Sequence, residues 1–572
     1  MADLTSSSSD ERFSAFVAHL VGRLSTLKAR LKGEDMEKIQ IIPPPFSFLR
    51  IAGHQTDIDL QEKVGALYVD SVFWLADPSE LNQELVLLQG QLKQLLRLKG
   101  RDPRWLIAWG AAQKSIPPVT LSDYWGGRSV SAREPSIPGL FSAQGKSLID
   151  AFFQEIDGAL NDPAIAGELK TSFDRWYREN AFESWRQFVA VFPRGREMLT
   201  SADSWRQMAP QMGGDKSPYF VLIKNVNREF ESTAAIDLVP WVRHLRQLRD
   251  LQATPDFWRY RQALEKAAKA VSDPSQASQS TAQAFDSAVA PGSSAFGAAF
   301  DALAKLKSSA PRDVSQDPIV WNLVSGPLQF LWEHARQETA DRLQSDWESK
   351  VLANATGLDG TQALPVLLTQ DGPVMRFAKD QAAPYVEWKP GNGYCAKEMF
   401  GGSVPFTSAF FSFLNGAVWV SSIKDLQVDL TALAPETNAN AKRIPHITRL
   451  TLHCGGKTQV LSNRRLRVIE KSFNEVEKSF VWSSACDATD LEIDIAGTRL
   501  VKTYPGAFGF FAFLHDFKDG KHTFYRSNFP EKAKDLADLG VESIAMHYRL
   551  RGAPDFAAPK AAPAKIVWSW SR

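Results

Sequence analysis

Apolar and polar positions along this chain follow two periods, one before and one after about Lys424. Before that residue, apolar side chains recur every three or four positions, which is the period of an amphipathic helix. Beyond it they alternate with polar side chains, which is the period of a half-buried strand. The pattern predicts an α+β multidomain protein, with α-helical bundle subdomains followed by a C-terminal antiparallel β-sandwich-like domain.

The clearest predicted helix begins at Pro78, with Asp77 as its N-cap, Glu80 completing a capping box and Gly100 as its stop. Leucines line one face of this helix at positions 81, 85, 88, 92 and 95. Because no heptad with flanking charges extends the stripe, a bundle core is favoured over a partner-binding zipper. Further helices are expected over about 8–32, behind a capping box from Ser8 to Glu11, and over 59–74, 105–113 and 321–351.

A row of aromatic residues lies within a long helical segment between Phe173 and Val189. Its members are spaced by three, four and seven residues: Phe173, Trp176, Tyr177, Phe182, Trp185 and Phe188. Such a row is normally core, since each ring buries a large apolar area. The alternative, a stacking surface for a carbohydrate or a nucleotide, would need the rings on an open concave face.

Strand alternation is clearest at Leu450–Cys454, Leu491–Ile495 and Ile544–Leu550, and the tail repeats it at Ile566, Trp568 and Trp570. Phe508, Phe510, Phe511 and Phe513 are expected to pack beneath the sheet. Polar turns are expected around 455–456, 487–490 and 519–520, and such surface turns are suited to recognition.

Length and composition predict five parts. These are an N-terminal helical region (1–130), a central helical domain (131–271), a flexible linker rich in Ser, Ala, Gln and Gly (272–312), a second helical domain (313–420) and the C-terminal β domain (421–572).

The totals exclude several classes of protein. The 66 basic and 65 acidic residues nearly cancel, so nothing in the net charge of +1 attracts nucleic acid. Cys395, Cys454 and Cys486 form no Cys-x-x-Cys pair; buried free thiols are favoured, and at most one bridge could form in an oxidising compartment. The sequence shows no run of about 18 apolar residues and no secretory signal at its start.

One stretch resembles a phosphate-binding loop because it ends in Gly145-Lys146-Ser147. That loop needs four residues between its glycines and a buried strand before it. Here five residues separate Gly139 from Gly145, and Pro135 and Pro138 precede the stretch. An inert helix start with Ser147 exposed is therefore favoured, and an NTPase using residues 145–147 is the enzymatic alternative.

The remaining chemistry is sparse. The nine histidines show no His-x-x-x-His spacing, and His453 and Cys454 point to opposite faces if they lie on a strand. His515 is expected to be a cation at a helix end. We therefore predict no catalytic, cofactor-binding or metal-binding residue, and a protein that is not an enzyme.

Five segments carry a resemblance to a known family. Ile137–Gly145 reads Ile-Pro-Gly-Leu-Phe-Ser-Ala-Gln-Gly, Tyr177–Phe188 is an aromatic helix, and Lys216–Val226 begins a helix with Ser-Pro-Tyr. In order and spacing these are similar to the periplasmic region of the IcmF/TssM family, the large inner-membrane subunit of type VI secretion. Residues 382–387 and 504–517 extend the resemblance to roughly residues 60–550. Lys216 replaces a usual acidic residue, Ser142 a usual Thr, and Ala512 a usual Arg.

What the resemblance implies is a structural subunit of the type VI membrane complex. Its expected partners are an outer-membrane lipoprotein of the TssJ type, bound through the β end, a TssL-like inner-membrane subunit or a separate membrane-anchored half, and copies of itself. The expected location is the cell envelope, on the periplasmic side of the inner membrane. Full-length members carry transmembrane helices upstream, so a fragment or a split subunit is expected; a soluble cytoplasmic adaptor is the other alternative.

Overall fold

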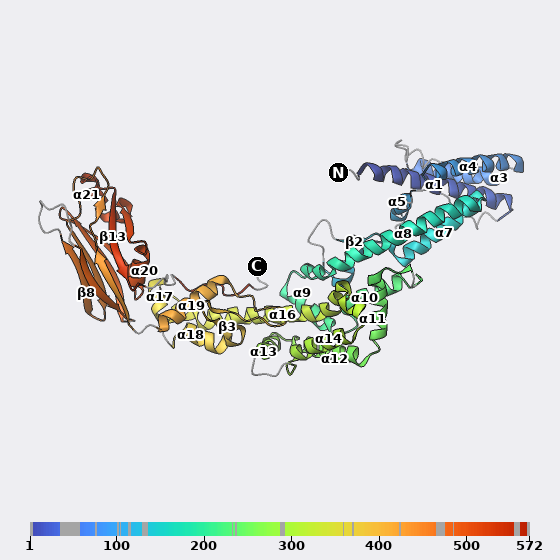
Figure 1. The fold of residues 1–572 in the computed structure, drawn as a ribbon. Helices are drawn as coiled ribbons and strands as arrows, with labels where there is room; N and C mark the ends of the chain where they lie inside the picture. The colour runs from blue at the N-terminus through green and yellow to red at the C-terminus, as the bar shows by residue number, and fades with distance from the viewer. Residues whose placement is uncertain are drawn as a thin grey trace. The chain divides into compact units, whose positions relative to one another are not determined.

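The computed structural model of the chain describes residues 4–34, 58–74, 77–99, 102, 104–112, 116–127, 135–231, 233–234, 237–286, 292–358, 360–368, 371–422, 425–464, 475–483, 485–553 and 561–568. Two compact units divide the chain. The helical unit comprises Met1–Ala268 and Asp301–Phe330, and the mixed unit comprises Lys269–Phe300 and Leu331–Arg572. Helices dominate the first and antiparallel sheets appear in the C-terminal part of the second (Figure 1), which confirms the predicted α+β multidomain class.

Many of the helices begin with proline, whose missing N–H would have no partner inside the helix at that position. The helices are α1 (Leu4–Leu31), α3 (Ile58–Trp74), α4 (Pro78–Lys99), α5 (Trp105–Ala112), α6 (Ser122–Trp125), α7 (Ala143–Leu160), α8 (Pro163–Val191), α9 (Ala202–Met212), α10 (Pro218–Glu229), α11 (Pro240–Leu251), α12 (Pro255–Ala270), α13 (Pro274–Phe285), α14 (Ala295–Ser309), α15 (Arg312–Gln316), α16 (Pro318–Lys350), α17 (Gly360–Leu367), α18 (Pro373–Phe377), α19 (Ser408–Ser422), α20 (Gly509–Asp516) and α21 (Ala533–Asp538). In the described parts of the chain, none of them is both long and apolar enough to cross a bilayer.

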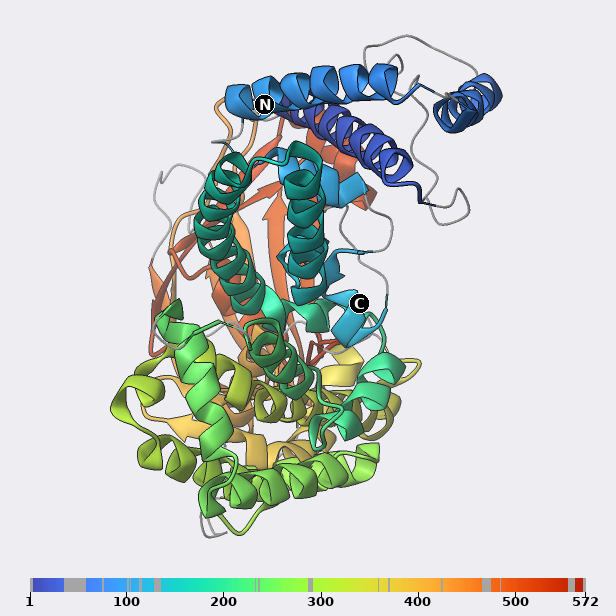
Figure 2. The ribbon, with the colours of Figure 1, turned by 90° about the vertical axis from the view of Figure 1, so that its right-hand side faces the viewer.

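The leucine stripe of α4 lies in a bundle core, as predicted. Leu81, Leu88 and Leu92 are buried together with side chains of α1, α5, α7 and α8, and Leu85 and Leu95 pack against the same core. α7 and α8 lie side by side in this bundle (Figure 2). The predicted capping box at Ser8 is wrong because α1 already begins at Leu4. Relative to alanine, each serine costs only about half a kcal/mol in a helix. The run of serines near the N-terminus therefore does not prevent α1 from forming there.

Two antiparallel sheets form the C-terminal part of the mixed unit. Their strand orders are β11-β10-β7-β8 and β12-β13-β5-β9, with β6 also paired to β13. The strands are β5 (Leu426–Ala432), β6 (Glu436–Thr437), β7 (Ile447–Cys454), β8 (Lys457–Arg464), β9 (Val476–Trp482), β10 (Cys486–Ile495), β11 (Thr498–Pro505), β12 (Lys521–Tyr525) and β13 (Ser543–Arg551). Two short antiparallel strand pairs lie elsewhere: β1 (Val119–Thr120) with β2 (Ser136–Ile137), and β3 (Val386–Lys389) with β4 (Gly393–Ala396).

Side chains of both sheets enter one hydrophobic core. The alternating residues named from the sequence line it, including Leu450, Leu491 and Ile544. Helix α20 adds Phe510, Phe511 and Phe513, which are buried, while Phe508 packs against the same core. The expectation that these rings pack beneath the sheet is confirmed. His515 lies in the last turn of α20, where a cation was expected.

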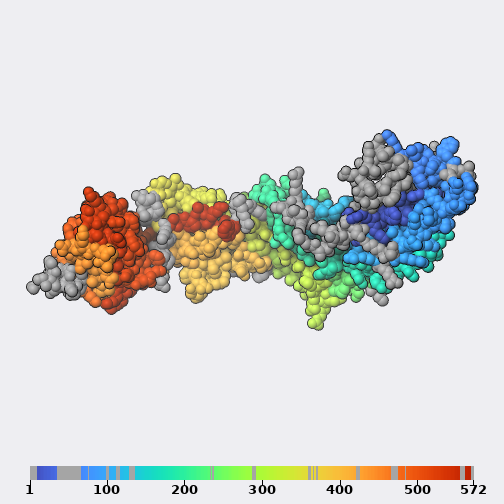
Figure 3. Space-filling view, turned by 90° about the horizontal axis from the view of Figure 1, so that it is seen from above, coloured from blue at the N-terminus to red at the C-terminus, as the bar shows by residue number. Residues whose placement is uncertain are grey.

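Two predictions about the β region are wrong. Residues 487–490 do not form a turn but lie within β10, where Thr489 pairs with Leu452 of β7 and Tyr504 of β11. Pairing on both sides overrides the turn preference of the aspartates. The described part of the tail, residues 561–568, is not a strand either: within it only Val567 forms a bridge, to Phe406, and Ile566 and Val567 are both buried. Residues 561–568, the dark red strip in Figure 3, accept hydrogen bonds from Gln344 and Trp347 of α16 and bond to the backbone of Pro405 and Thr407, just before α19. Trp570 lies outside the described residues.

The stretch predicted as a flexible linker contains all of α13 and α14. In the mixed unit, Thr281 and Phe285 of α13 are fully buried, and Phe285 stacks on Trp332 of α16. The flexibility of this stretch and the five predicted boundaries stay predictions.

Candidate functional site

The turn before α7 is held by the aromatic helix α8. This 3-10 turn spans Gly139–Phe141. Tyr177 donates its hydroxyl hydrogen to the backbone oxygen of Leu140 at 3.0 Å, and Trp185 Nε1 donates to that of Phe141 at 2.9 Å. Burial raises the pKa of Tyr177, so its hydroxyl remains a donor at neutral pH. Two separate motifs of the sequence therefore meet through backbone carbonyl groups.

The helix that begins within the third motif, α10, reaches the same place. Ser142 caps α7, its hydroxyl oxygen accepting from the N–H of Gly145 at 3.1 Å. The N–H of Ala143 donates to the carboxylate of Glu229, the last residue of α10. A helix N-terminus carries a partial positive charge that favours an anion. In this protein its own glutamate supplies that anion.

The Gly-Lys-Ser segment is built into this contact. A Cβ at Gly145 would lie 2.4 Å from the backbone oxygen of Gly139, so the helix and the turn touch through backbone. Lys146 lies 2.6 Å from Asp150 and 3.0 Å from Asp174, so two carboxylates hold its ammonium group. Ser147 is exposed, as predicted. The carboxylate of Glu229 already accepts from the N-terminus of α7, and two further carboxylates pair with Lys146. The arrangement therefore does not form a phosphate cradle.

The aromatic row of α8 packs mainly inward. Phe173, Phe182, Trp185 and Phe188 are buried, and Trp176 and Tyr177 are half-buried against the same bundle. The core interpretation is confirmed, and this row offers no open stacking face.

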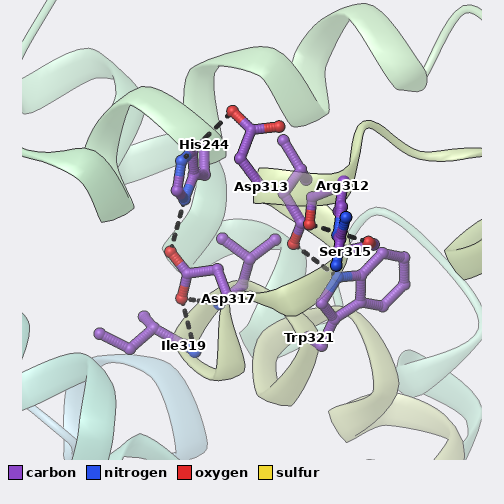
Figure 4. Close-up of polar contacts among 9 residues, drawn as sticks. His244, Arg312, Asp313, Ser315, Asp317, Ile319 and Trp321 are labelled. Carbon is purple, nitrogen blue, oxygen red and sulfur yellow. Dashed lines mark hydrogen bonds and ion pairs between the residues drawn. The ribbon is translucent and has the colours of Figure 1, made fainter.

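His244 lies between two aspartates of the helical unit (Figure 4). Its Nδ1 is 2.7 Å from Asp317 and its Nε2 is 3.7 Å from Asp313. Asp317 also caps α16, since it accepts from the N–H of Ile319 at 2.9 Å. The cluster joins α11 to the start of α16 and is a structural clamp. Among the described residues, no group of three or more His, Cys, Asp and Glu could hold a metal ion.

Cys454 and Cys486 form a disulfide between β7 and β10, which corrects the favoured interpretation of free thiols for these two residues. Cys395 remains a half-buried free thiol. The pairing brings together residues that lie 32 positions apart, which spacing alone could not identify. His453 points away from the bridge and lies 2.9 Å from Asp490.

The two C-terminal sheets, which we call the β part, have four edge strands of two kinds. Gln459 of β8 exchanges hydrogen bonds with the backbone of Val481 in β9, at 2.6 and 2.9 Å, and Lys478 of β9 donates to the backbone oxygen of Val460. Side chains therefore cover the β8 and β9 edges. β11 and β12 pair with described strands on one side only, and we call them the open edges. An unpaired edge is a template for another chain.

Several of these features leave no trace in the sequence. Glu229 and Asp317 are single acidic residues among many, and only the fold brings them to a helix N-terminus. Proline and serine before a helix could have suggested where the helices are capped. They could not suggest which distant carboxylate also binds at the helix N-terminus.

No family model and no curated protein matches this sequence. Two solved structures are similar. One, titled "Type VI membrane complex", is 14% identical, has a TM-score of 0.34, and aligns over 83% of this chain and 100% of its own. The other, the C-terminal domain of the T6SS protein TssM from EAEC, is 16% identical, has a TM-score of 0.25, and aligns over 40% of this chain and 99% of its own.

Proposed function

We propose that this chain is a non-enzymatic structural subunit of a type VI secretion membrane complex, similar to the periplasmic portion of TssM/IcmF. Its β part binds an outer-membrane lipoprotein of the TssJ type. Its other contacts are copies of itself and a TssL-like inner-membrane subunit or a separate membrane-anchored half.

The observation that carries the proposal is the meeting of the resemblance motifs. The Pro-Gly-Leu-Phe turn, the aromatic helix and the Ser-Pro helix are far apart in sequence, yet they contact one another through Tyr177, Trp185 and Glu229. The segments that carry the resemblance therefore meet in one packed site. The last of the five segments, 504–517, supplies the aromatic centre of the β core.

The disulfide supports a location in the cell envelope. Disulfides persist in oxidising compartments such as the periplasm and are rare in the cytosol. The Cys454–Cys486 bridge lies in the β part, which is the part proposed to meet the lipoprotein. It argues against the cytoplasmic adaptor, and the occupied N-terminus of α7 argues against the NTPase.

The open edges and the turns at 455–456 and 519–520 are the surface proposed for the lipoprotein. The hydrophobic core between the sheets is made by residues between Val428 and Tyr548, so residues 421–572 contain a core of their own and should fold alone. Tagged residues 421–572 should retain a purified TssJ-type lipoprotein lacking its lipid, and residues 1–270 should not. A folded β part that fails to retain the lipoprotein would refute this assignment.

A further inference from the structure

A groove of about 880 Å³ lies in the helical unit between α10 and α12, near the end of α11. These helices are labelled in Figure 1. Phe220, Ile223 and Phe257 are nearly buried and line it. A groove between two helices with an apolar floor has the form that receives a third, amphipathic helix.

Trp258 stands at this groove with 62% of its surface exposed. Of the residues that line the groove, it is the one exposed large apolar side chain. Tryptophan, with tyrosine and arginine, is enriched among the residues that dominate the binding energy of protein interfaces. The groove therefore combines a buried floor with an anchor that is open to solvent.

One wall of the groove is cationic. Lys224 and Arg228 project from α10 one helical turn apart, and Arg249 lies at the end of α11. All three are exposed, and within the described part of the chain none of them has an ion-pair partner. These three charges are available to a partner.

The other charges of the groove are arranged differently. Arg261 lies over the ring of Phe220 at 4.4 Å and pairs with Asp215 at 2.7 Å, so it belongs to the wall itself. Glu231 and Glu265 also line the groove, which leaves three unpaired cations against two acidic residues. The cationic excess is concentrated along α10.

We propose that this groove binds an acidic amphipathic helix of another protein. The apolar stripe of that helix would lie on Phe220 and Ile223 and against Trp258, and its carboxylates would face Lys224 and Arg228. This surface lies outside residues 421–572, so the interaction is separate from lipoprotein binding, and failure of either proposal leaves the other intact.

The test uses the full chain and a fluorescein-labelled synthetic peptide of about 18 residues, or five helical turns. The peptide carries Leu at i, i+3, i+4 and i+7 with Glu on one flank, and a matched peptide carries Lys in place of Glu. Fluorescence anisotropy should show the Glu peptide binding at least about tenfold more tightly than the Lys peptide. Trp258→Ala should weaken the Glu peptide by about tenfold or more.

Charge reversal separates the groove from general attraction. Lys224→Glu with Arg228→Glu should reverse the preference, so that the Lys peptide binds more tightly. Lys266→Glu with Lys305→Glu, which changes two exposed lysines outside the groove, should leave the preference as it is. All four sites are exposed, so the variants should unfold at the temperature of the parent chain.

Three results would overturn the proposal. The first is equal binding of both peptides, and the second is no binding of the Glu peptide. The third is that Lys266→Glu with Lys305→Glu changes the peptide preference as much as Lys224→Glu with Arg228→Glu does. Sedimentation velocity is run in parallel: a dimer that Trp258→Ala abolishes would make the groove a contact between copies of this chain and would also overturn the assignment.

Discussion

Replacing Gly145 by alanine tests whether the start of α7 is a packed contact or an ordinary helix turn. On helix propensity alone, alanine should stabilise a helical position by about 0.5–1 kcal/mol relative to glycine. The structure predicts the opposite sign. The new methyl group would lie 2.4 Å from the oxygen of Gly139 and 2.6 Å from the Cα of Leu140, and both atoms are backbone.

The magnitude follows from what must move. Backbone cannot rotate away as a flexible side chain can, so the turn and the helix have to separate. Overpacking of this kind costs about 1–3 kcal/mol. Separation would also stretch the hydrogen bonds of Tyr177 and Trp185 to the turn, each worth about 1 kcal/mol. We expect Gly145→Ala to destabilise the helical unit by about 2–4 kcal/mol.

Gly158 provides the matched control, because it lies in the same helix and nothing is within 4 Å of its added Cβ. Gly158→Ala should therefore be neutral or stabilise by up to about 1 kcal/mol. Urea unfolding followed by tryptophan fluorescence and by far-UV circular dichroism measures both variants. If Gly145→Ala were as stable as Gly158→Ala, the packed contact would not exist as described.

Three further outcomes are expected. Reducing the Cys454–Cys486 bridge, or replacing both residues by serine, should cost the β part about 3–4 kcal/mol in a denaturant titration, the loop-closure value for a separation of 32 residues, while Cys395→Ser should change little. Burial lowers the pKa of His19 to about 4, from the ordinary 6.5. Because the unfolded chain binds the proton more tightly than the folded chain, the free energy of unfolding should be highest above about pH 6.5 and fall as the pH drops towards 4. In His19→Gln, the urea concentration at half-unfolding should depend less on pH across that window. Mg²⁺-ATP should neither bind measurably by calorimetry nor raise the Tm, and Lys146→Ala should change neither result; magnesium-dependent binding lost in that variant would restore the NTPase interpretation.

The sequence predicts those parts of the fold that depend on periodicity. The leucines of α4 and the alternating residues of β7, β10 and β13 lie where their spacing placed them, because burial of one face decides each element. Prediction failed where tertiary pairing overrides local preference. Residues 487–490 have turn composition, yet strands on both sides incorporate them into β10.

Long-range contacts of the candidate sites were beyond the sequence for a different reason. The distance from Glu229 to Ala143 or from His244 to Asp317 along the chain is large, and every acidic residue is an equal candidate until the fold selects one. The disulfide is similar, since three cysteines allow three pairings. Sequence patterns can show that a helix needs a cap or that a thiol could pair, but not the residue that does so.

The most direct measurement of the central claim is the affinity of a purified TssJ-type lipoprotein, lacking its lipid, for the whole chain and for residues 421–572, determined by isothermal titration calorimetry. If the β part carries the interaction, the two Kd values should agree within about threefold, which corresponds to less than 1 kcal/mol. Binding to the whole chain that is lost or greatly weakened in a folded 421–572 protein would contradict the account.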